Sequence, residues 1–313
     1  MSNLRNSDLG VMPELSQNYS PDLNLKLFEK MSDIRYFEFE VCSAYHEKKV
    51  KMPVFYLSAG SESIPAALSL ALLEERFKKK LDIFAQHRAH GYYIAFGGDL
   101  EKLVDELLSR PTGCAGGMGG SASIHCPEIG MYGHDGLMGS NIPIGVGYAL
   151  GKSFESPLEE RKLILAVAGD AAMEEDYAQA AIAWTPTREL PVLFVCEDNN
   201  YSVMTKVDVR RKWKMASIAD SYGLESVEIS DDPWTIMYHA KTLKEKTPSF
   251  LNIQTCRYFA HNFGLPKQEM EWDRFQLTKQ ELTRIGLGKE AEEIDKSSQH
   301  KMEELWKRKL AQI

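Results

Sequence analysis

The chain has 313 residues, of which 43% are apolar and 26% are charged. This composition predicts a substantial buried core and excludes global disorder. Acidic residues outnumber basic ones by 45 to 37, and the formal net charge of −8 argues against a nucleic-acid-binding protein, which would present a basic face. No stretch approaches the roughly 20 apolar residues that cross a bilayer, so we expect a soluble protein without a membrane partner.

The five cysteines are odd in number and include no C-x-x-C pair. This pattern is atypical of a disulfide framework or a zinc ribbon and favours a reducing compartment. The N-terminus has neither the basic start nor the apolar run of a signal peptide. Together these features predict a cytoplasmic protein.

The first predicted elements are helical. Residues 1–21 are rich in Ser, Asn and Pro without a hydrophobic period, and we expect them to form a flexible N-terminal arm. Ser20 followed by proline is a typical helix start, and apolar spacing predicts a helix over about 22–48. A second helix is expected over about 61–80, where the basic run Lys78–Lys80 suits a helix C-terminus.

Short apolar runs separated by helical segments then follow. Such runs are typical of buried parallel strands, and the alternation predicts an α/β fold with a doubly wound parallel sheet. The expected strands are Leu81–Ala85 (the weakest), Leu163–Ala168, Val192–Cys196 and Phe250–Ile253. Helices are expected over residues 171–184 and 233–246, and the charged tail, 279–313, is expected to be a solvated or packing helix.

The segment Pro111–Ser121 contains too many glycines for regular structure. Two interpretations remain open for it. It forms a mobile surface loop, or it brings backbone close to a ligand at positions where a Cβ atom would intrude.

Polar side chains follow two of the expected strands. Asp170 comes directly after Leu163–Ala168 and its glycine, and Asn199 follows Val192–Cys196. Ligands of doubly wound sheets gather outside the carboxyl ends of the strands, so we expect these side chains to share one crevice. A carboxylate, an amide oxygen and a nearby backbone carbonyl suit Mg²⁺, and phosphate oxygens usually complete its coordination. Each piece alone is also compatible with a helix cap or a turn.

Several motifs resemble, in order, those of one family: the alpha subunit of the thiamine diphosphate-dependent component of 2-oxo acid dehydrogenases (pyruvate, branched-chain and acetoin dehydrogenases). Gly169-Asp170-Ala171 followed by Asn199 is similar to its cofactor signature, GDG followed by NN. The other matching segments are His87–Gly91, Gly119–Ser121 with His125, Gly136–Pro143, Leu190–Val192 and Thr255–His261.

The resemblance implies thiamine diphosphate and Mg²⁺ as cofactors. It also implies that residues 22–313 form a single diphosphate-binding α/β domain with N- and C-terminal helical extensions. The roles it implies are metal ligation by Asp170, Asn199 and the Tyr201 carbonyl; diphosphate contacts by His87, Arg88, Ala171 and Ala172; main-chain bonds to the aminopyrimidine by Gly136 and Met138; and a covering loop with Arg257 and His261. His261 and Tyr56 are the candidate catalytic side chains.

The family's alpha subunit lacks the glutamate that activates the aminopyrimidine. The resemblance therefore implies a beta-type partner that carries this residue in a pyrimidine-binding domain, in an alpha2beta2 heterotetramer. A lipoyl acyltransferase or another carrier protein is a further possible partner. Ala171 replaces the usual glycine, and Tyr56 stands near the position of the family's active-site histidine. These departures leave the acid/base group and the substrate open.

Three functions remain open. The first is an oxidoreductase component that decarboxylates a 2-oxo acid and transfers the acyl unit to a lipoyl group. The second is a carboligase or ketol transferase of a biosynthetic pathway. The third is a non-catalytic subunit, which the intact Asp170, Asn199, Arg88 and His261 disfavour. A nucleotide-binding Rossmann protein is disfavoured because no G-x-G-x-x-G follows the strand Leu163–Ala168.

Overall fold

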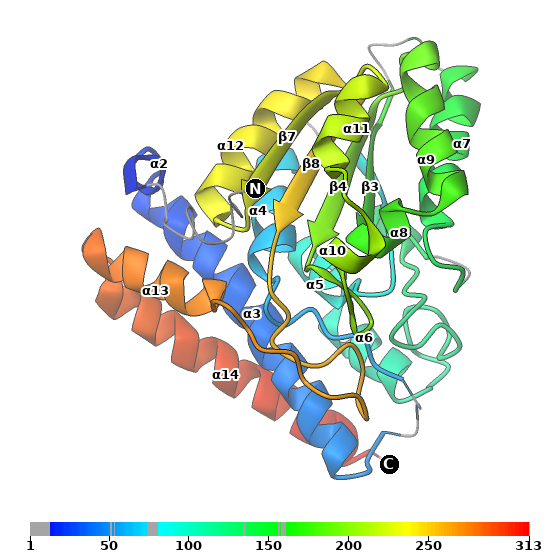
Figure 1. Cartoon of the computed structure of the whole chain (residues 1–313). Coiled ribbons are helices and arrows are strands. Elements are labelled where there is room, and N and C mark those ends of the chain that lie inside the picture. Colours follow the sequence, from blue (N-terminus) through cyan, green and yellow to red (C-terminus); the bar gives the residue numbers. More distant parts are fainter. Residues whose placement is uncertain are drawn as a thin grey trace.

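The computed structural model describes residues 13–50, 52, 54–73, 81–133, 136–155, 157 and 161–312. Within these ranges, one parallel sheet has six strands in the order β2-β1-β3-β4-β8-β7. The strands are β1 (Leu81–Ala85), β2 (Met131–Tyr132), β3 (Leu163–Gly169), β4 (Val192–Asp198), β7 (Glu225–Ser230) and β8 (Ser249–Gln254). Helices cover both faces of this sheet (Figure 1). The predicted doubly wound α/β fold is confirmed.

Helices form a layer on each face of the sheet. One layer packs around α3 (Pro21–His46), α4 (Ser63–Leu72), α5 (His90–Ala95), α6 (Leu100–Leu107), α12 (Pro233–Leu243), α13 (Arg274–Arg284) and α14 (Gly288–Leu310). The other contains α7 (Asn141–Ser153), α8 (Asp170–Met173), α9 (Asp176–Trp184) and α11 (Met215–Ser221). Shorter elements are α2 (Pro13–Gln17), α10 (Val207–Arg210), the hairpin β5 (Tyr201–Ser202) and β6 (Thr205–Lys206), and the 3₁₀ turns Pro127–Ile129, Thr185–Arg188 and Lys244–Lys246.

The alternation of side chains along β3 explains why its sequence is apolar throughout. Leu165 and Val167 belong to the core beneath α3 and α4, whereas Ile164, Ala166 and Ala168 belong to the core beneath α7 and α9. A central parallel strand buried on both faces has no polar side to show. The two layers of helices therefore fix the position of β3 and of Asp170, which directly follows it.

The N-terminal and C-terminal helices pack together. Ser20 caps α3 and accepts a hydrogen bond from the Leu23 amide at 3.3 Å, so the helix start predicted at this serine is confirmed. α14 lies along α3, which places the charged tail against the core through the buried Trp306 (Figure 1). Within the expected arm, Pro13–Gln17 form α2 and the Ser16 hydroxyl donates to Glu281; residues 1–12 lie outside the described residues.

Three details differ from the sequence-based expectations. The helix expected over 171–184 is two helices, α8 and α9, because Glu175 is extended and the Gln179 side chain caps the Met173 carbonyl. Strand β7 was not predicted; it forms the half-buried edge of the sheet, where apolar patterning is weak. α4 ends at Leu72, and the basic run Lys78–Lys80 lies outside the described residues.

None of the described helices combines the length and the apolar character that spanning a bilayer would need.

Candidate cofactor-binding site

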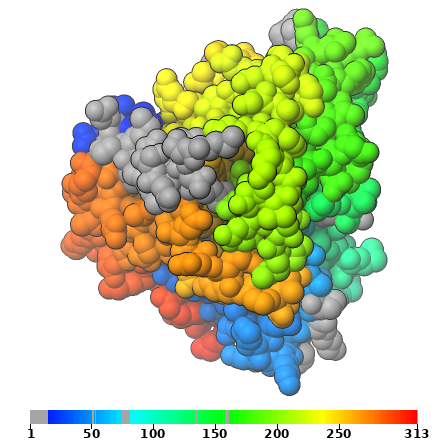
Figure 2. Space-filling view, viewed as in Figure 1, coloured from blue at the N-terminus to red at the C-terminus, as the bar shows by residue number. Residues whose placement is uncertain are grey.

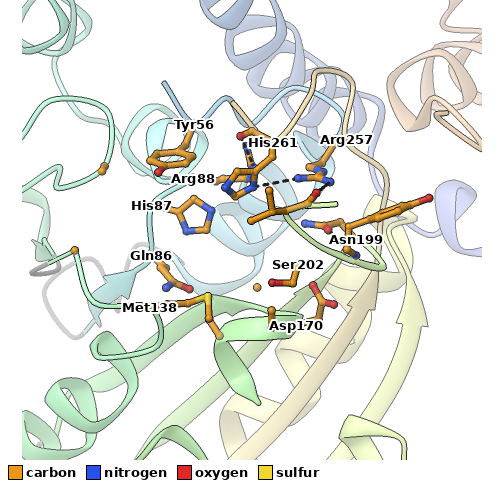
Figure 3. A pocket seen from close by; sticks show the side chains of 17 residues that line it. Tyr56, Gln86, His87, Arg88, Met138, Asp170, Asn199, Ser202, Arg257 and His261 are labelled. Atoms are coloured by element: carbon orange, nitrogen blue, oxygen red, sulfur yellow. Dashed lines mark hydrogen bonds between the residues drawn. The ribbon is translucent and has the colours of Figure 1, made fainter. Parts of the chain in front are cut away.

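A cavity of about 290 Å³ opens where β1, β3 and β4 end (Figure 3). It is lined by Tyr56, Gln86, His87, Arg88, Ala122, Gly136, Met138, Gly169, Asp170, Ala171, Ala172, Asn199, Tyr201, Ser202, Val203, Arg257 and His261. Every site residue named from the sequence is in this set. In Figure 3, Tyr56, Arg88 and His261 lie at one end of the cavity, and Asp170 and Ser202 lie toward the other. The crevice expected at the carboxyl ends of the strands is therefore present.

Neighbouring strands bring Asp170 and Asn199 together. β3 and β4 are paired, with Gly169 opposite Glu197, so the residues that follow them emerge at the same edge. Both side chains line the cavity, and the Asn199 side-chain oxygen accepts a hydrogen bond from the Tyr201 amide at 3.1 Å. This bond places the Tyr201 backbone beside the amide oxygen. Three residues that carry hard oxygen donors thus line one cavity.

Burial makes Asp170 a costly anion. The side chain is 1% exposed, and burial together with the nearby charge of Asp198 raises the pKa of its carboxyl to about 7, against the opposing effect of Arg210. A carboxylate in this environment is stabilised as an anion by a neighbouring cation. Among the described residues, no group of three or more His, Cys, Asp and Glu could hold a metal ion. A metal here would therefore need the Asn199 amide, a backbone carbonyl and oxygens of the ligand.

Two buried guanidinium groups flank His261 at the other end of the cavity. Arg88 Nη2 lies 3.1 Å and Arg257 Nη1 lies 3.2 Å from His261 Nδ1. Arg88 also donates to the backbone oxygens of Leu57 and His261, and Arg257 to Val203 O and Gln268 Oε1. Among the described residues, every hydrogen-bond acceptor of these two arginines is neutral. Because buried charges are normally paired, two arginines without a directly bonded carboxylate make this end of the cavity a candidate site for an anion.

The same bonds fix the tautomer of His261. Guanidinium groups only donate, so Nδ1 accepts and the proton of the neutral ring is on Nε2. Burial and the two positive charges lower the pKa of His261 to about 4. His261 is therefore a neutral hydrogen-bond donor at physiological pH and is unsuited to act there as a cationic acid.

We expect an NMR titration to show His261 neutral down to about pH 5, since its pKa lies near 4 instead of the ordinary 6.5. The unfolded chain would take up this proton first, so the free energy of unfolding should fall as the pH drops from 6.5 toward 4. His261→Asn assigns the resonance. Arg257→Met should raise the pKa, because it removes one of the two charges; an unchanged pKa in that variant would contradict the electrostatic explanation.

Tyr56 forms an aromatic wall with two histidines. Its ring lies edge-on to His87, with centroids 4.7 Å apart, and to His261 at 5.4 Å. The Arg88 guanidinium lies 5.8 Å from the Tyr56 ring centroid. Tyr56 therefore lies at the end of the cavity that His261 and Arg88 also line.

A buried hydrogen-bond relay holds the backbone of Tyr56. The Glu38 carboxylate lies 3.0 Å from His90 Nδ1, and His90 Nε2 lies 3.0 Å from the Ser121 hydroxyl oxygen. That oxygen accepts a bond from the Tyr56 amide at 2.9 Å, while Glu38 also accepts from the Ser58 amide at 2.7 Å. Two points of the segment that carries Tyr56 are thus anchored to one glutamate. Sequence analysis placed His90 and Ser121 in family motifs without finding this function.

The glycine-rich segment wraps around an internal carboxylate. Glu106 accepts four backbone hydrogen bonds of 2.7–2.9 Å, from the amides of Ala115, Gly117, Gly119 and Gly120. A Cβ on Gly113 would lie 2.5 Å from Glu106 Oε2, which explains why that position is glycine. The close backbone approach was one of the two open interpretations, but its partner is a glutamate of α6. The glycine-rich segment leads directly into Ser121, which bonds to the Tyr56 amide, and Ala122, which lines the cavity.

Glu106→Gln is expected to lower the free energy of unfolding by roughly 2–4 kcal/mol. The side-chain NH₂ would face amides that only donate, and the charge that strengthens the four bonds would be lost. Chemical denaturation measures the change. Glu293→Gln, on the exposed surface of α14, is the matched control and should stay within about 0.5 kcal/mol of the wild type. Equal stability of both variants would show that the four amide hydrogen bonds to Glu106 do not stabilise the glycine-rich segment.

The remaining predicted contacts are main-chain positions. Ala171 and Ala172 form the first turn of α8, where a helical backbone accommodates the Ala171 methyl group that replaces the usual glycine. Gly136 has a φ of +90°, a conformation that favours glycine. The Met138 carbonyl accepts a hydrogen bond from the Tyr177 hydroxyl and keeps a second lone pair for a ligand. All four line the cavity, and their roles stay predictions.

Sequence analysis missed three polar residues at the site: Gln86 and Ser202, which line the cavity, and Arg210 beside it. Gln86 directly precedes the motif that begins at His87, and its Oε1 is buried without a hydrogen-bond partner among the described residues. Arg210 pairs with Asp170 from helix α10. Its only signal in the sequence was a second basic residue beside it, which is equally typical of an exposed helix end.

Two loops meet beside the cavity. Arg257 and Gln268 both donate to the Val203 carbonyl, at 3.1 and 3.3 Å. Figure 2 shows the segments around residues 200–215 and 255–270 side by side on one face of the molecule. The loop that carries His261 is therefore attached to the loop that carries Asn199 and Tyr201.

The fold and the cavity define an α/β protein with a cavity at the carboxyl ends of its central strands, lined by two buried arginines. A family model described as the dehydrogenase E1 component matches residues 29–307, and the chain belongs to this family. The resemblance found in the motifs is confirmed, and membership implies thiamine diphosphate as the cofactor.

Similar proteins include alpha subunits of the pyruvate dehydrogenase E1 component. The mitochondrial subunit of Solanum tuberosum is 25% identical over 258 residues, which cover 81% of this chain and 64% of the relative. That of Saccharomyces cerevisiae is 26% identical over 261 residues, covering 81% and 59%. That of Dictyostelium discoideum is 30% identical over 193 residues, covering 62% and 48%. The chain thus spans less than two thirds of each of these relatives.

The expected cytoplasmic location is contradicted by these relatives, each of which is named a mitochondrial protein. The expectation rested on cysteine usage and on the lack of a secretory signal. Cysteine usage reports redox conditions, and a reducing environment is not confined to one compartment.

Proposed function

We propose that the chain is the alpha-type subunit of a thiamine diphosphate- and Mg²⁺-dependent enzyme that decarboxylates a 2-oxo acid and passes the acyl unit to a lipoyl or other acceptor. The observation that carries this proposal is the pair of buried arginines, Arg88 and Arg257, with only neutral acceptors among the described residues. They would create an anion site in the same cavity to which Asp170 and Asn199 contribute oxygen donors. Membership of the dehydrogenase E1 component family supports the cofactor.

The residues present fit a metal–diphosphate group. Asp170, the Asn199 amide oxygen and the Tyr201 carbonyl would hold Mg²⁺, since all three are hard oxygen donors. Arg88 would pair with the diphosphate, because a planar guanidinium matches phosphate oxygens. Further contacts would come from His87, Arg257, the amides of Ala171 and Ala172, and the main chain of Gly136 and Met138.

The side chains at the other end would act on the substrate. When bound, thiamine diphosphate supplies a carbanion and an electron sink. His261 would donate its Nε2 proton in a hydrogen bond to a developing oxyanion or to the substrate carboxylate. Tyr56 would contribute a hydroxyl donor and exclude water from the reacting centre. Each of these functions uses a neutral donor or a fixed charge, consistent with the low pKa of His261.

A beta-type partner is part of this proposal. It would carry a pyrimidine-binding domain and the glutamate that activates the aminopyrimidine, in an alpha2beta2 assembly. The family implies such a partner, and the main sheet of the described residues is a single six-stranded parallel sheet. A lipoyl acyltransferase or carrier protein would be the further partner.

Co-expression with a beta-type subunit tests the function. We expect the chain alone to be inactive and the complex to reduce an artificial electron acceptor when given a 2-oxo acid, thiamine diphosphate and Mg²⁺. A panel of 2-oxo acids differing in side-chain size identifies the substrate. Full turnover by the chain alone would contradict the need for a partner, and a complex that binds no thiamine diphosphate would contradict the function.

One observation favours a second candidate, a carboligase or ketol transferase. By the resemblance, Tyr56 stands near the position of the family's active-site histidine, and a phenol and an imidazole differ as acid/base groups. An enzyme that passes its two-carbon unit to an aldehyde can differ at this position from one that acylates a lipoyl group. Ketose phosphates and aldehyde acceptors belong in the same panel, and product analysis separates the two functions.

A further inference from the structure

Arg210 forms an ion pair with the candidate metal ligand Asp170. Its Nη2 contacts Asp170 Oδ2 and lies 3.1 Å from Glu174 Oε1. The neighbouring Arg211 places Nε 2.9 Å from the same Glu174 oxygen and Nη2 3.5 Å from Asp198 Oδ2. The carboxylates of Asp170, Glu174 and Asp198 therefore form one ion-pair network with the two guanidinium groups beside the cavity.

This pairing competes with a metal. Asp170 is 1% exposed, so its carboxylate needs a cation beside it, and Arg210 supplies one. A divalent ion on the same carboxylate would meet the guanidinium charge at close range in a poorly screened environment. Mg²⁺ and Arg210 therefore cannot both bind the Asp170 carboxylate strongly, and one of them must move away from it.

The geometry allows the Arg210 side chain to leave Asp170 without unfolding its surroundings. The nitrogen that contacts Asp170 also bonds to Glu174, so Arg210 keeps an acidic partner when it leaves Asp170. Its Nε and Nη1 are buried and have no hydrogen-bond partner among the described residues. Within the described residues, these two nitrogens therefore do not hold the guanidinium group in its present position.

The position of Arg210 connects it to the metal ligands. It ends α10, which follows directly on the hairpin β5–β6, and the Val207 amide donates to Asn200 O at 3.0 Å. The hairpin begins at Tyr201, whose carbonyl is a proposed ligand, and Asn199 precedes it. A shift of Arg210 is thus transmitted over a short, bonded segment to two of the three metal ligands.

We propose that Arg210 is the resident counter-cation of Asp170 in the metal-free chain and is exchanged for the divalent ion when the cofactor binds. The exchange sets the affinity of the site for the metal alone, so that the metal binds weakly until the diphosphate adds its own oxygens. This inference rests on the proposed metal site. It makes Arg210 a residue that regulates metal binding and that touches neither substrate nor cofactor.

Titration of the full chain with Mn²⁺, followed by electron paramagnetic resonance without thiamine diphosphate, tests the proposal. Arg210→Met keeps the apolar stem and removes the charge, and it should bind Mn²⁺ about tenfold more tightly than the wild type. Arg210→Gln is a second variant with the same expected direction, in case the first folds poorly. A residue with a merely structural function would give the opposite result, because its loss would disorder the ligands and weaken binding.

Arg211→Met is the matched control, since Arg211 contacts Glu174 and Asp198 without contacting Asp170. Its charge acts on Asp170 more weakly than that of Arg210, so the variant should bind Mn²⁺ less than about threefold more tightly than the wild type. Equal or weaker Mn²⁺ binding by both Arg210 variants, with wild-type binding intact, would overturn the exchange. If wild type and Asp170→Asn do not differ, even with thiamine diphosphate present, the proposed metal site itself fails, which is a separate result.

Discussion

Asp170→Asn is expected to weaken the binding of thiamine diphosphate by about 100-fold or more in the presence of Mg²⁺. Changing a residue that only supports a metal ligand typically costs about 10–100-fold, and the loss of a direct ligand should cost more. The amide keeps the size of the side chain but removes the charge that a divalent ion needs. The variant should also lose the Mg²⁺ dependence of binding. Isothermal titration calorimetry with and without the metal measures both effects.

Asp176→Asn is the matched control for Asp170→Asn. It makes the same change on an exposed residue at the start of α9, near the site in sequence but outside the cavity lining. Its binding should equal that of the wild type. If Asp170→Asn retained metal-dependent binding, the assignment of Asp170 as a ligand would be wrong. If both variants lost binding, the cause would be a general loss of negative charge.

Arg88→Met is the second change with a large expected effect. It should weaken thiamine diphosphate binding by about 10–100-fold, the equivalent of one or two charge-assisted hydrogen bonds. The binding of Mn²⁺ alone should change little, because none of the proposed metal ligands is a hydrogen-bond partner of Arg88. This separation between metal and cofactor affinity distinguishes an anion-binding arginine from one that supports the whole site.

Arg88→Lys and Arg188→Met complete the series. The lysine keeps the charge but has one nitrogen in place of the two with which Arg88 bonds to Leu57 O and His261 O. Its affinity for thiamine diphosphate should therefore fall between those of Arg88→Met and the wild type. Arg188 is exposed at the end of a 3₁₀ turn, and its loss should have no effect on binding. Equal affinity of Arg88→Met and wild type would show that the diphosphate does not reach Arg88.

The sequence predicted the central part of the fold because its signals are local. The buried strands that become β3, β4 and β8 show as uniformly apolar runs, and the cap at Ser20 lies next to the helix it begins. β7 was missed because an edge strand with half-buried side chains has no such run. The break between α8 and α9 was missed because it depends on Gln179 bonding to Met173 O, a contact without a pattern of its own.

The residues of the site likewise include some that the sequence predicts and some that it does not. Asp170 and Asn199 could be placed from the sequence because each directly follows a predictable strand, and parallel strands end at one edge. Arg210 and Glu106 could not be placed, because each acts across a turn whose shape is set by tertiary packing. The pairing of Arg88 and Arg257 around one ring nitrogen joins segments 169 positions apart, a relation that motif order alone does not show.

Anomalous diffraction from Mn²⁺ in crystals of the complex with thiamine diphosphate tests the central proposal most directly. We expect one strong peak within about 2.5 Å of an Asp170 carboxylate oxygen, the Asn199 amide oxygen and the Tyr201 carbonyl, with diphosphate oxygens completing its coordination. A cofactor-bound crystal with its manganese elsewhere, or with Asp170 still paired to Arg210 and no ion beside it, would contradict the proposed metal–diphosphate site.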